Sequence, residues 1–198
     1  MVERGRDSGW ITALFVRWSR QPAKAGQRRL VMGAGAVTFG LLVPAALAKA
    51  ADFLGDRRGS AGWRFHHWEV PALLVGGAGI MLAAWSVRVL YRDGRGTPAP
   101  LMPTRTLLTH GPYAWCRNPM TLGVLLYYGA VALWRESLMM LLLVGLFGGI
   151  MLLYIKLVEE RELEARFGET FRRYCETTPF IVPRLMRRRK VSEKDEGS

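Results

Sequence analysis

Four long apolar runs constrain this chain more than any other feature of its sequence. They cover residues 30–50, 70–91, 120–134 and 137–155. The charged residues inside them are Lys49 and Arg88, and each lies close to the end of its run. A helix needs about 20 apolar residues to cross roughly 30 Å of hydrocarbon. The runs therefore predict an all-α protein, a multi-pass transmembrane helical bundle with about four spans.

The last two runs are separated by Arg135 and Glu136 alone. Taken as one helix, residues 120–155 would extend about 54 Å, far more than a bilayer requires. The sequence therefore predicts a helical hairpin that turns at this charged pair. The first arm of the hairpin, about 22 Å long, is short for a full span, so the turn before it would be drawn into the membrane edge.

The charge distribution predicts how the helices are oriented. The chain has 28 Lys and Arg against 16 Asp and Glu, which gives a formal net charge of +12. Segments 1–29, 88–119 and 156–194 hold 23 of these basic residues. Because cytoplasmic flanks collect Lys and Arg, we expect an integral membrane protein with both termini and the middle loop in the cytoplasm. This division by membrane side disfavours a nucleic-acid partner, and the absence of charge at mid-depth disfavours a transporter.

The two ends of the chain flank a membrane domain that we expect over residues 30–190. Residues 1–29 are basic, and they predict either an amphipathic helix along the membrane surface or a poorly ordered tail. The first apolar run is not interpreted as a secretory signal, because seven basic residues precede it and its length suits a span. Residues 191–198 predict a disordered tail.

The segment after the hairpin, residues 157–176, predicts a cytoplasmic amphipathic helix. Its apolar residues recur at spacings of four, four and three, which makes one stripe along a helix. The members of that stripe are Leu163, Phe167, Phe171 and Tyr174. Gly168 lies inside this helix, where glycine costs about 1 kcal/mol, and it predicts a bend.

The cysteines and histidines give little sign of special chemistry. Cys116 and Cys175 both fall on the predicted cytoplasmic face, where thiols stay reduced, so we expect packing roles and no disulfide. The adjacent His66 and His67 have no Cys or carboxylate at ligand spacing. The sequence therefore predicts no metal site.

The stretch "HGPYAWCRNPMTLG" places a polar turn directly before the third apolar run. Asn is a favoured N-cap and Pro is favoured at the first helical position, so Asn118 and Pro119 predict a helix start. The unpaired N–H groups of that helix, with Arg117 beside them, would attract an anion. Glu159 and Glu160, across the hairpin, could hold a cationic group. These residues predict a site for an amphiphilic, zwitterionic ligand at the bilayer edge.

Two motifs, "LLTHGPYAWCRNPMTLG" and "EERELEARFGETFRRY", stand on either side of the predicted hairpin. Together they resemble the isoprenylcysteine carboxyl methyltransferase and phospholipid methyltransferase superfamily of integral membrane enzymes. The family pattern is Gly-x-Tyr, then Arg-His-Pro-x-Tyr-x-Gly, a hydrophobic hairpin, and Glu-Glu-x-x-Leu followed by Phe-Gly and two tyrosines. The resemblance covers about residues 101–184. It implies an S-adenosylmethionine-dependent methyltransferase whose lipidic, hydrophobic or prenylated acceptor enters sideways from the bilayer.

The resemblance also implies which residues would form the site. Arg117 would stand beside the cofactor or the nucleophile as the catalytic residue. Glu159 and Glu160 would reach the cofactor from the tail helix. The other residues implied to bind S-adenosylmethionine are Arg105, Thr106, Leu107, Leu108, Gly111, Tyr113, Asn118 and Pro119.

Several positions depart from the family pattern. Asn118 replaces the usual His and cannot titrate near neutral pH, so general-base catalysis from this position is excluded. Thr121 replaces the usual Tyr, and Ile155 stands where carboxyl-methylating relatives have an arginine. A phospholipid amine or a small thiol therefore stays open as the acceptor, and so does a non-catalytic membrane scaffold of the same fold. The sequence indicates no particular oligomeric state.

Overall fold

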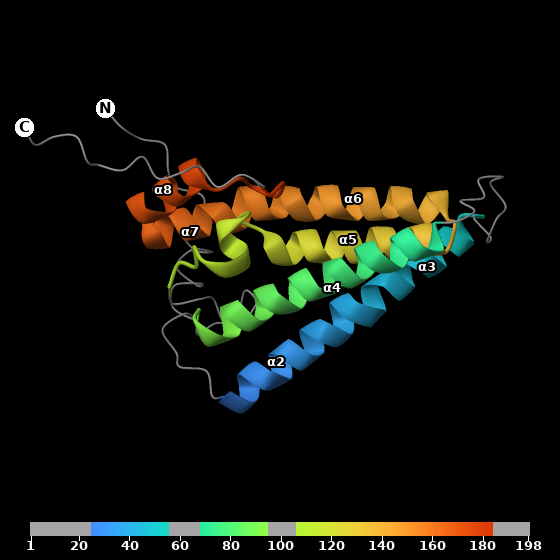
Figure 1. Cartoon of the computed structure of the whole chain (residues 1–198), viewed down its shortest axis with the longest axis horizontal. Coiled ribbons are helices and arrows are strands. Elements are labelled where there is room, and N and C mark those ends of the chain that lie inside the picture. Colours follow the sequence, from blue (N-terminus) through green and yellow to red (C-terminus); the bar gives the residue numbers. More distant parts are fainter. Residues whose placement is uncertain (1–24, 56–67, 95–105, 184–198) are drawn as a thin grey trace, which may run out of the picture.

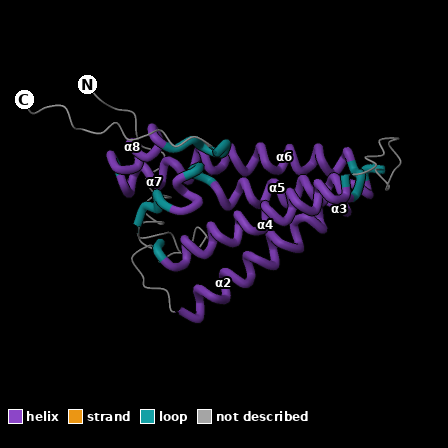
Figure 2. The backbone as a smooth tube through the Cα atoms, in the orientation of Figure 1, coloured by secondary structure: helices purple, strands orange, loops and turns teal. Residues whose placement is uncertain are grey.

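The computed structural model describes residues 25–55, 68–94 and 106–183, and within these ranges the chain is helical and has no strand (Figures 1 and 2). The helices are α2 (Ala25–Val37), α3 (Val43–Phe53), α4 (Glu69–Arg92), α5 (Pro119–Trp134), α6 (Leu138–Tyr154), α7 (Glu160–Phe167) and α8 (Glu169–Thr177). The π-helical segments η1 (Thr38–Leu42) and η3 (Ile155–Glu159) join α2 to α3 and α6 to α7, and η2 (Gly111–Ala114) is a 3₁₀ turn. The predicted all-α class is confirmed.

Three helical stretches have the length and composition to cross a membrane. They are Arg29–Phe53, Glu69–Arg92 and Leu138–Phe167. The other apolar helix, α5, has 16 residues, so it extends about 24 Å and is shorter than the hydrocarbon layer. Many large apolar side chains on the long helices point outwards, as contact with lipid requires; they include Leu73, Leu142, Leu146 and Ile150. The chain is an integral membrane protein in which α5 is shorter than the three spanning stretches.

Some sequence predictions lie outside the described residues. The basic segment 1–29 is described only from residue 25, where α2 begins. The predicted tail 191–198 is not described, and neither are His66 and His67.

The predicted hairpin is formed by α5 and α6, which lie side by side in Figure 1. The chain reverses directly after α5, where Glu136 adopts a φ of 53°. Ser137 then caps α6, because its hydroxyl oxygen accepts a hydrogen bond from the backbone N–H of Met140 at 3.0 Å. The hairpin core contains Tyr128 and Met140, both fully buried, packed with Ala51 of α3. Arg135 and Glu136 thus mark the turn, as the sequence predicted.

The closest packing in the bundle joins α4 to α5. A Cβ added to Gly79 would lie 2.6 Å from the carbonyl oxygen of Gly123, which is an impossible contact. In lipid, small residues let helix backbones approach one another where water supplies no driving force. This glycine contact therefore fixes α4 against the hairpin.

The regular α-helix of the first span is interrupted by the π-helical turn η1, which we call the kink, and two tyrosines of α5 donate hydrogen bonds to its carbonyl groups. Pro44 has no N–H, so one carbonyl group in the preceding turn loses its backbone donor. The hydroxyl of Tyr128 donates to the Phe39 oxygen at 2.6 Å, and that of Tyr127 donates to the Gly40 oxygen at 3.0 Å. A polar group without a partner is costly in hydrocarbon, so these bonds stabilise the bend.

The two halves of the first span therefore behave differently. α3 packs on α5 and α6, and Asp52 near its end accepts a 2.6 Å ion-paired hydrogen bond from Arg135 in the hairpin turn. α2, on the other side of the kink, leans away from α4 (Figure 1). The kink lets one long apolar stretch pack at one end and diverge from the bundle at the other.

Replacing Tyr128 with Phe should destabilise the bundle by about 1 kcal/mol, because it leaves the Phe39 carbonyl unpaired inside the bundle. Unfolding by increasing mole fraction of SDS would measure the change. Tyr154→Phe, at an exposed tyrosine on α6, is the matched control and should unfold like the wild type. Equal stability of all three proteins would contradict this account of the kink.

The segment over residues 157–176 is not one helix, and the bend predicted at Gly168 is a complete break. Gly168 adopts φ 53° and ψ −125°, a conformation that glycine alone accepts readily, and it separates α7 from α8. The predicted stripe is therefore broken: Phe171 and Tyr174 are buried on α8, whereas Leu163 and Phe167 on α7 are only half-buried. α7 instead continues α6 through η3 without a break. Gly168 marks a sharp turn that folds α8 back, as the tube view shows (Figure 2).

Candidate functional site

The segment that leads into α5 is tied to the end of α4. The imidazole Nε2 of His110 lies 2.8 Å from a carboxylate oxygen of Asp93, and the hydroxyl of Thr106 donates to the Asp93 backbone oxygen at 3.1 Å. Gly111 adopts a φ of 61°, and a Cβ there would press on Val89 at 3.4 Å. The Gly-Pro sequence thus lets the chain turn closely against α4 and enter η2.

α5 begins where the sequence predicted, but its cap differs from the prediction. Pro119 is the first helical residue, and Asn118 occupies the N-cap position. The Asn118 side chain makes no capping hydrogen bond. Its amide nitrogen Nδ2 instead donates to the backbone oxygen of Phe180, 3.0 Å away and beyond the end of α8.

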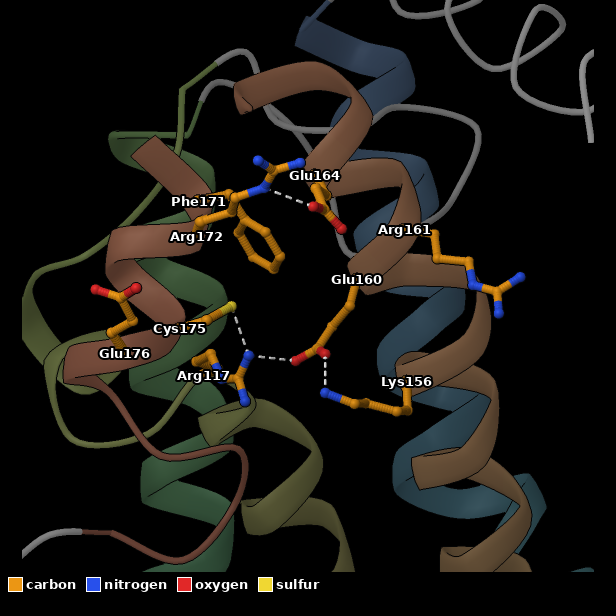
Figure 3. A pocket seen from close by; sticks show the side chains of 9 residues that line it. All are labelled: Arg117, Lys156, Glu160, Arg161, Glu164, Phe171, Arg172, Cys175 and Glu176. Atoms are coloured by element: carbon orange, nitrogen blue, oxygen red, sulfur yellow. Dashed lines mark hydrogen bonds and ion pairs between the residues drawn. The ribbon is translucent and has the colours of Figure 1, made fainter. Parts of the chain in front are cut away.

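A buried ion pair joins the two sequence motifs at this end of the bundle (Figure 3). The Arg117 Nη1 atom lies 2.7 Å from Oε1 of Glu160, and Lys156 Nζ lies 2.6 Å from Oε2 of the same carboxylate. The side chains of Arg117 and Glu160 are each only 11% exposed. Because an isolated buried charge is strongly unfavourable, neither residue can be removed without leaving the other poorly compensated.

The ion pair leaves hydrogen-bonding capacity unused. Arg117 Nε is buried and has no hydrogen-bond partner among the described residues. Glu160 Oε1 lies within ion-pair distance of the guanidinium, but it accepts no hydrogen bond of good geometry. Buried polar groups are normally paired, and because these two atoms have almost no exposed surface, a ligand could reach them only if the ion pair opened.

Two further groups surround the Arg117 guanidinium. The Sγ atom of Cys175 accepts a contact from Nη1 at 2.6 Å, and burial raises the pKa of that thiol although Arg117 opposes the shift. The guanidinium carbon lies 5.5 Å from the centre of the Phe180 ring, and Lys156 Nζ lies at the same distance from it. At this distance the ring attracts both cations and so helps to hold their positions.

The two neighbouring carboxylates, Glu159 and Glu160, have different surroundings. Neighbouring residues of a helix point about 100° apart, so Glu160 faces Arg117 while Glu159 faces elsewhere. Burial raises the pKa of the Tyr113 hydroxyl, and the negative charge of Glu159 raises it further. The phenol of Tyr113 therefore stays protonated at neutral pH. The backbone oxygen of Tyr113 accepts a 2.6 Å hydrogen bond from the Tyr174 hydroxyl of α8.

An open pocket of about 490 Å³ lies beside the ion pair, which is a size typical of small-ligand sites. Its lining residues are Arg117, Lys156, Glu160, Arg161, Glu164, Phe171, Arg172, Cys175 and Glu176 (Figure 3). Among the described residues, no group of three or more His, Cys, Asp or Glu is placed to hold a metal ion.

The structure brings some predicted site residues together and leaves others apart. Arg117 and Glu160 meet in the pocket, while Tyr113 and Glu159 are not among its lining residues. Leu108 is buried and Leu107 is half-buried. Thr106, Gly111, Asn118 and Pro119 shape the turn between α4 and α5, and Arg105 lies outside the described residues.

Sequence reasoning missed Lys156, Cys175 and Phe180. Lys156 precedes Glu160 by four residues, which is a spacing that favours ion pairs on a helix, and this signal could have identified it. Cys175 was expected only to pack. Phe180 reaches the site because α8 folds back at Gly168. No sequence pattern around Phe180 predicts that contact.

Replacing Arg117 with Gln should destabilise the protein by about 2 kcal/mol, since Glu160 would keep only Lys156 as a partner. Thermal unfolding in detergent would measure the loss. Arg173→Gln is the matched control: its pair with Glu169 is also Arg–Glu, but the two side chains are 76% and 64% exposed. Such surface pairs contribute little, so the control should unfold like the wild type. An equal loss of stability in both variants would show that the buried Arg117 pair contributes no more than the exposed pair.

Comparison with known protein families matches residues 68–170 to the phospholipid methyltransferase family. The match begins at residue 68, directly before α4, and contains the first motif, the hairpin and the second motif as far as residue 170. The chain belongs to this family of membrane methyltransferases. The superfamily membership that the two motifs predicted is thereby confirmed.

Two curated relatives are similar to the chain. The cobalt-zinc-cadmium resistance protein CzcN of Cupriavidus metallidurans is 31% identical over 164 residues, which cover 72% of this chain and 71% of that protein. Methanethiol S-methyltransferase 2 of Bradyrhizobium diazoefficiens is 35% identical over 112 residues, which cover 56% of this chain but only 40% of that enzyme. No solved structure matches the chain.

Proposed function

We propose that this membrane methyltransferase uses S-adenosylmethionine and transfers its methyl group to a lipidic or hydrophobic acceptor. The observation that carries the proposal is the buried pair between Arg117 and Glu160, which joins the two family motifs beside an open pocket. Family membership supports methyl transfer as the reaction class.

The charges at the site suit the amino-acid end of S-adenosylmethionine. An α-amino carboxylate is the electrostatic complement of an Arg–Glu pair: its carboxylate matches the guanidinium of Arg117, and its ammonium matches the carboxylate of Glu160. Once the pair opens, the unpartnered Arg117 Nε atom and the Glu160 Oε1 atom would supply the donor and the acceptor that such a group needs. Binding would replace the ion pair between Arg117 and Glu160 with two ion pairs to the ligand.

Transfer of an activated methyl group requires mainly alignment of the donor and the nucleophile. Tyr113, whose phenol stays protonated, would donate a hydrogen bond, and Glu159 would accept one from the cofactor. Asn118 supplies no titrating group, so the acceptor would arrive with its nucleophilic lone pair available.

The surroundings of the site support an acceptor that comes from the bilayer. Exposed apolar side chains lie within two helical turns of Glu160; they are Leu153, Tyr154, Leu157 and Val158. Together with the excess of basic residues at this end of the chain, they are consistent with a site at the cytoplasmic edge of the membrane, with both termini on that side.

A small thiol is the second candidate acceptor. The similarity to methanethiol S-methyltransferase 2 favours it, since that relative is named for the S-methylation of a thiol. A phospholipid amine follows from the name of the family. A non-catalytic scaffold remains the alternative if the pocket takes no cofactor.

Calorimetric titration of the detergent-purified protein with S-adenosylmethionine should show micromolar binding, which Glu159→Ala and Glu160→Gln should each weaken at least tenfold. Each carboxylate is expected to contact the cofactor, and a hydrogen bond to a charged group contributes about 1.5–3 kcal/mol. Glu169→Ala, on the exposed face of α8, is the control and should bind normally. No binding to a folded wild-type protein would refute the cofactor assignment, and unchanged binding by Glu159→Ala would refute that residue's role.

Methyl-labelled S-adenosylmethionine would identify the acceptor class. We expect label to pass to an acceptor with an alkyl or prenyl chain more efficiently than to its short water-soluble analogue, because the site lies among exposed apolar residues. The panel would pair a prenylcysteine carboxylate, a phosphatidylethanolamine and an alkyl thiol with such analogues. Preference for methanethiol over every long-chain acceptor would contradict the lipidic assignment and favour the small thiol.

A further inference from the structure

The chain beyond α8 returns to the start of α5 and forms a strap, residues 178–183. Two neighbouring residues fasten it: the backbone N–H of Arg117 donates to the Pro179 oxygen at 2.9 Å, and the Asn118 amide donates to the Phe180 oxygen at 3.0 Å. The first strap residue, Thr178, is buried. The strap is thus held by backbone acceptors that face the family motif.

Asn118 could in principle serve either the helix or the strap. An N-cap Asn normally accepts a hydrogen bond from the first N–H groups of its helix, through its side-chain oxygen. Asn118 makes no such bond, and its amide N–H points to Phe180. The residue is therefore used as a donor to the strap and not as an acceptor for α5.

The strap matters for the site because of its aromatic ring. The Phe180 ring lies 5.5 Å from both the Arg117 guanidinium and the Lys156 ammonium. The same two cations hold the two oxygens of Glu160. If the ring moves away, both cations lose one of the contacts that orient them.

We propose that Asn118 is a positioning residue whose amide fastens the strap and thereby holds Phe180 against the two cations of the cofactor site. This inference rests on the proposed function, because the oriented groups are those expected to bind S-adenosylmethionine. Asn118 acts through Phe180 and touches no reacting atom.

This role requires that the side chain of residue 118 donate a hydrogen bond. An amide donates a hydrogen bond at every accessible pH, and an imidazole, the usual group at this position in the family, also carries an N–H. A carboxylate cannot donate, and its charge would face the Phe180 carbonyl oxygen. The substitution of His by Asn preserves the donor that the strap requires.

Asn118→Asp separates this role from capping. Asp is as good an N-cap as Asn, and its charge suits a helix N-terminus, so a capping role predicts an unchanged or more stable protein. The strap role predicts the opposite. In full-length detergent-purified protein at pH 7.5, chymotryptic cleavage after Phe180, followed by mass spectrometry, should be roughly five times faster in Asn118→Asp, as expected for loss of one hydrogen bond. Asn118→His should be cleaved like the wild type.

The affinity for S-adenosylmethionine is the second readout. Asn118→Asp should weaken it roughly tenfold, and Asn118→His should restore it to within about twofold, since rescue requires only an N–H donor. Phe180→Ala leaves residue 118 intact and should weaken binding as much as Asn118→Asp. This variant keeps the test decisive if Asn118→Asp fails to fold.

The possible results separate the two claims. Unchanged cleavage and affinity in Asn118→Asp, or unchanged affinity in Phe180→Ala, would overturn the positioning role. Faster cleavage in Asn118→Asp without any S-adenosylmethionine binding by the wild type would refute the proposed function, and with it the assignment of Asn118 to cofactor positioning.

Discussion

The buried ion pair between Arg117 and Glu160 is the constraint on which the arrangement of this end of the molecule depends. Each side chain is about nine-tenths buried, so each needs the other to balance its charge. The two residues come from opposite sides of the α5–α6 hairpin. The hairpin turn, the start of α5 at Pro119 and the continuous passage from α6 through η3 into α7 must therefore all be in place before the pair can form.

The membrane imposes a second constraint on the remainder of the bundle. In hydrocarbon every backbone polar group needs a partner inside the protein. Pro44 breaks this rule in the first span, and the hydroxyl groups of Tyr127 and Tyr128 restore it. The kink is consequently coupled to α5, the helix that begins directly after Arg117 and the N-cap residue Asn118. The same short helix supports the bend on one side and the candidate site on the other.

Sequence patterns predicted the parts of the structure that depend on local chemistry. The length of the apolar runs predicted the long helices. Arg135 and Glu136 predicted the hairpin turn, and Pro119 predicted the start of α5. Tertiary contacts decided the parts that the sequence misjudged. A bend was predicted at Gly168, but its backbone conformation ends the amphipathic helix there, and that break brings α8 and Phe180 back to Arg117.

The candidate site shows the same division between local and tertiary information. Arg117 and Glu160 were recognisable from their motifs, but the separation of Glu159 from Glu160 follows from helix geometry that a list of motif residues does not express. The side chain of Asn118 could have capped α5 by propensity alone. It bonds to the strap because the fold places a carbonyl oxygen there.

A double-mutant cycle on Arg117 and Glu160, with the S-adenosylmethionine dissociation constant as readout, would test the central claim most directly. Arg117→Gln, Glu160→Gln and the double variant would be compared with the wild type in the same detergent. If the two residues form one charged unit that receives the cofactor, each single change should weaken binding strongly, and the double variant should bind no worse than the weaker single variant. Losses that simply add, or equal affinity in all four proteins, would contradict the account.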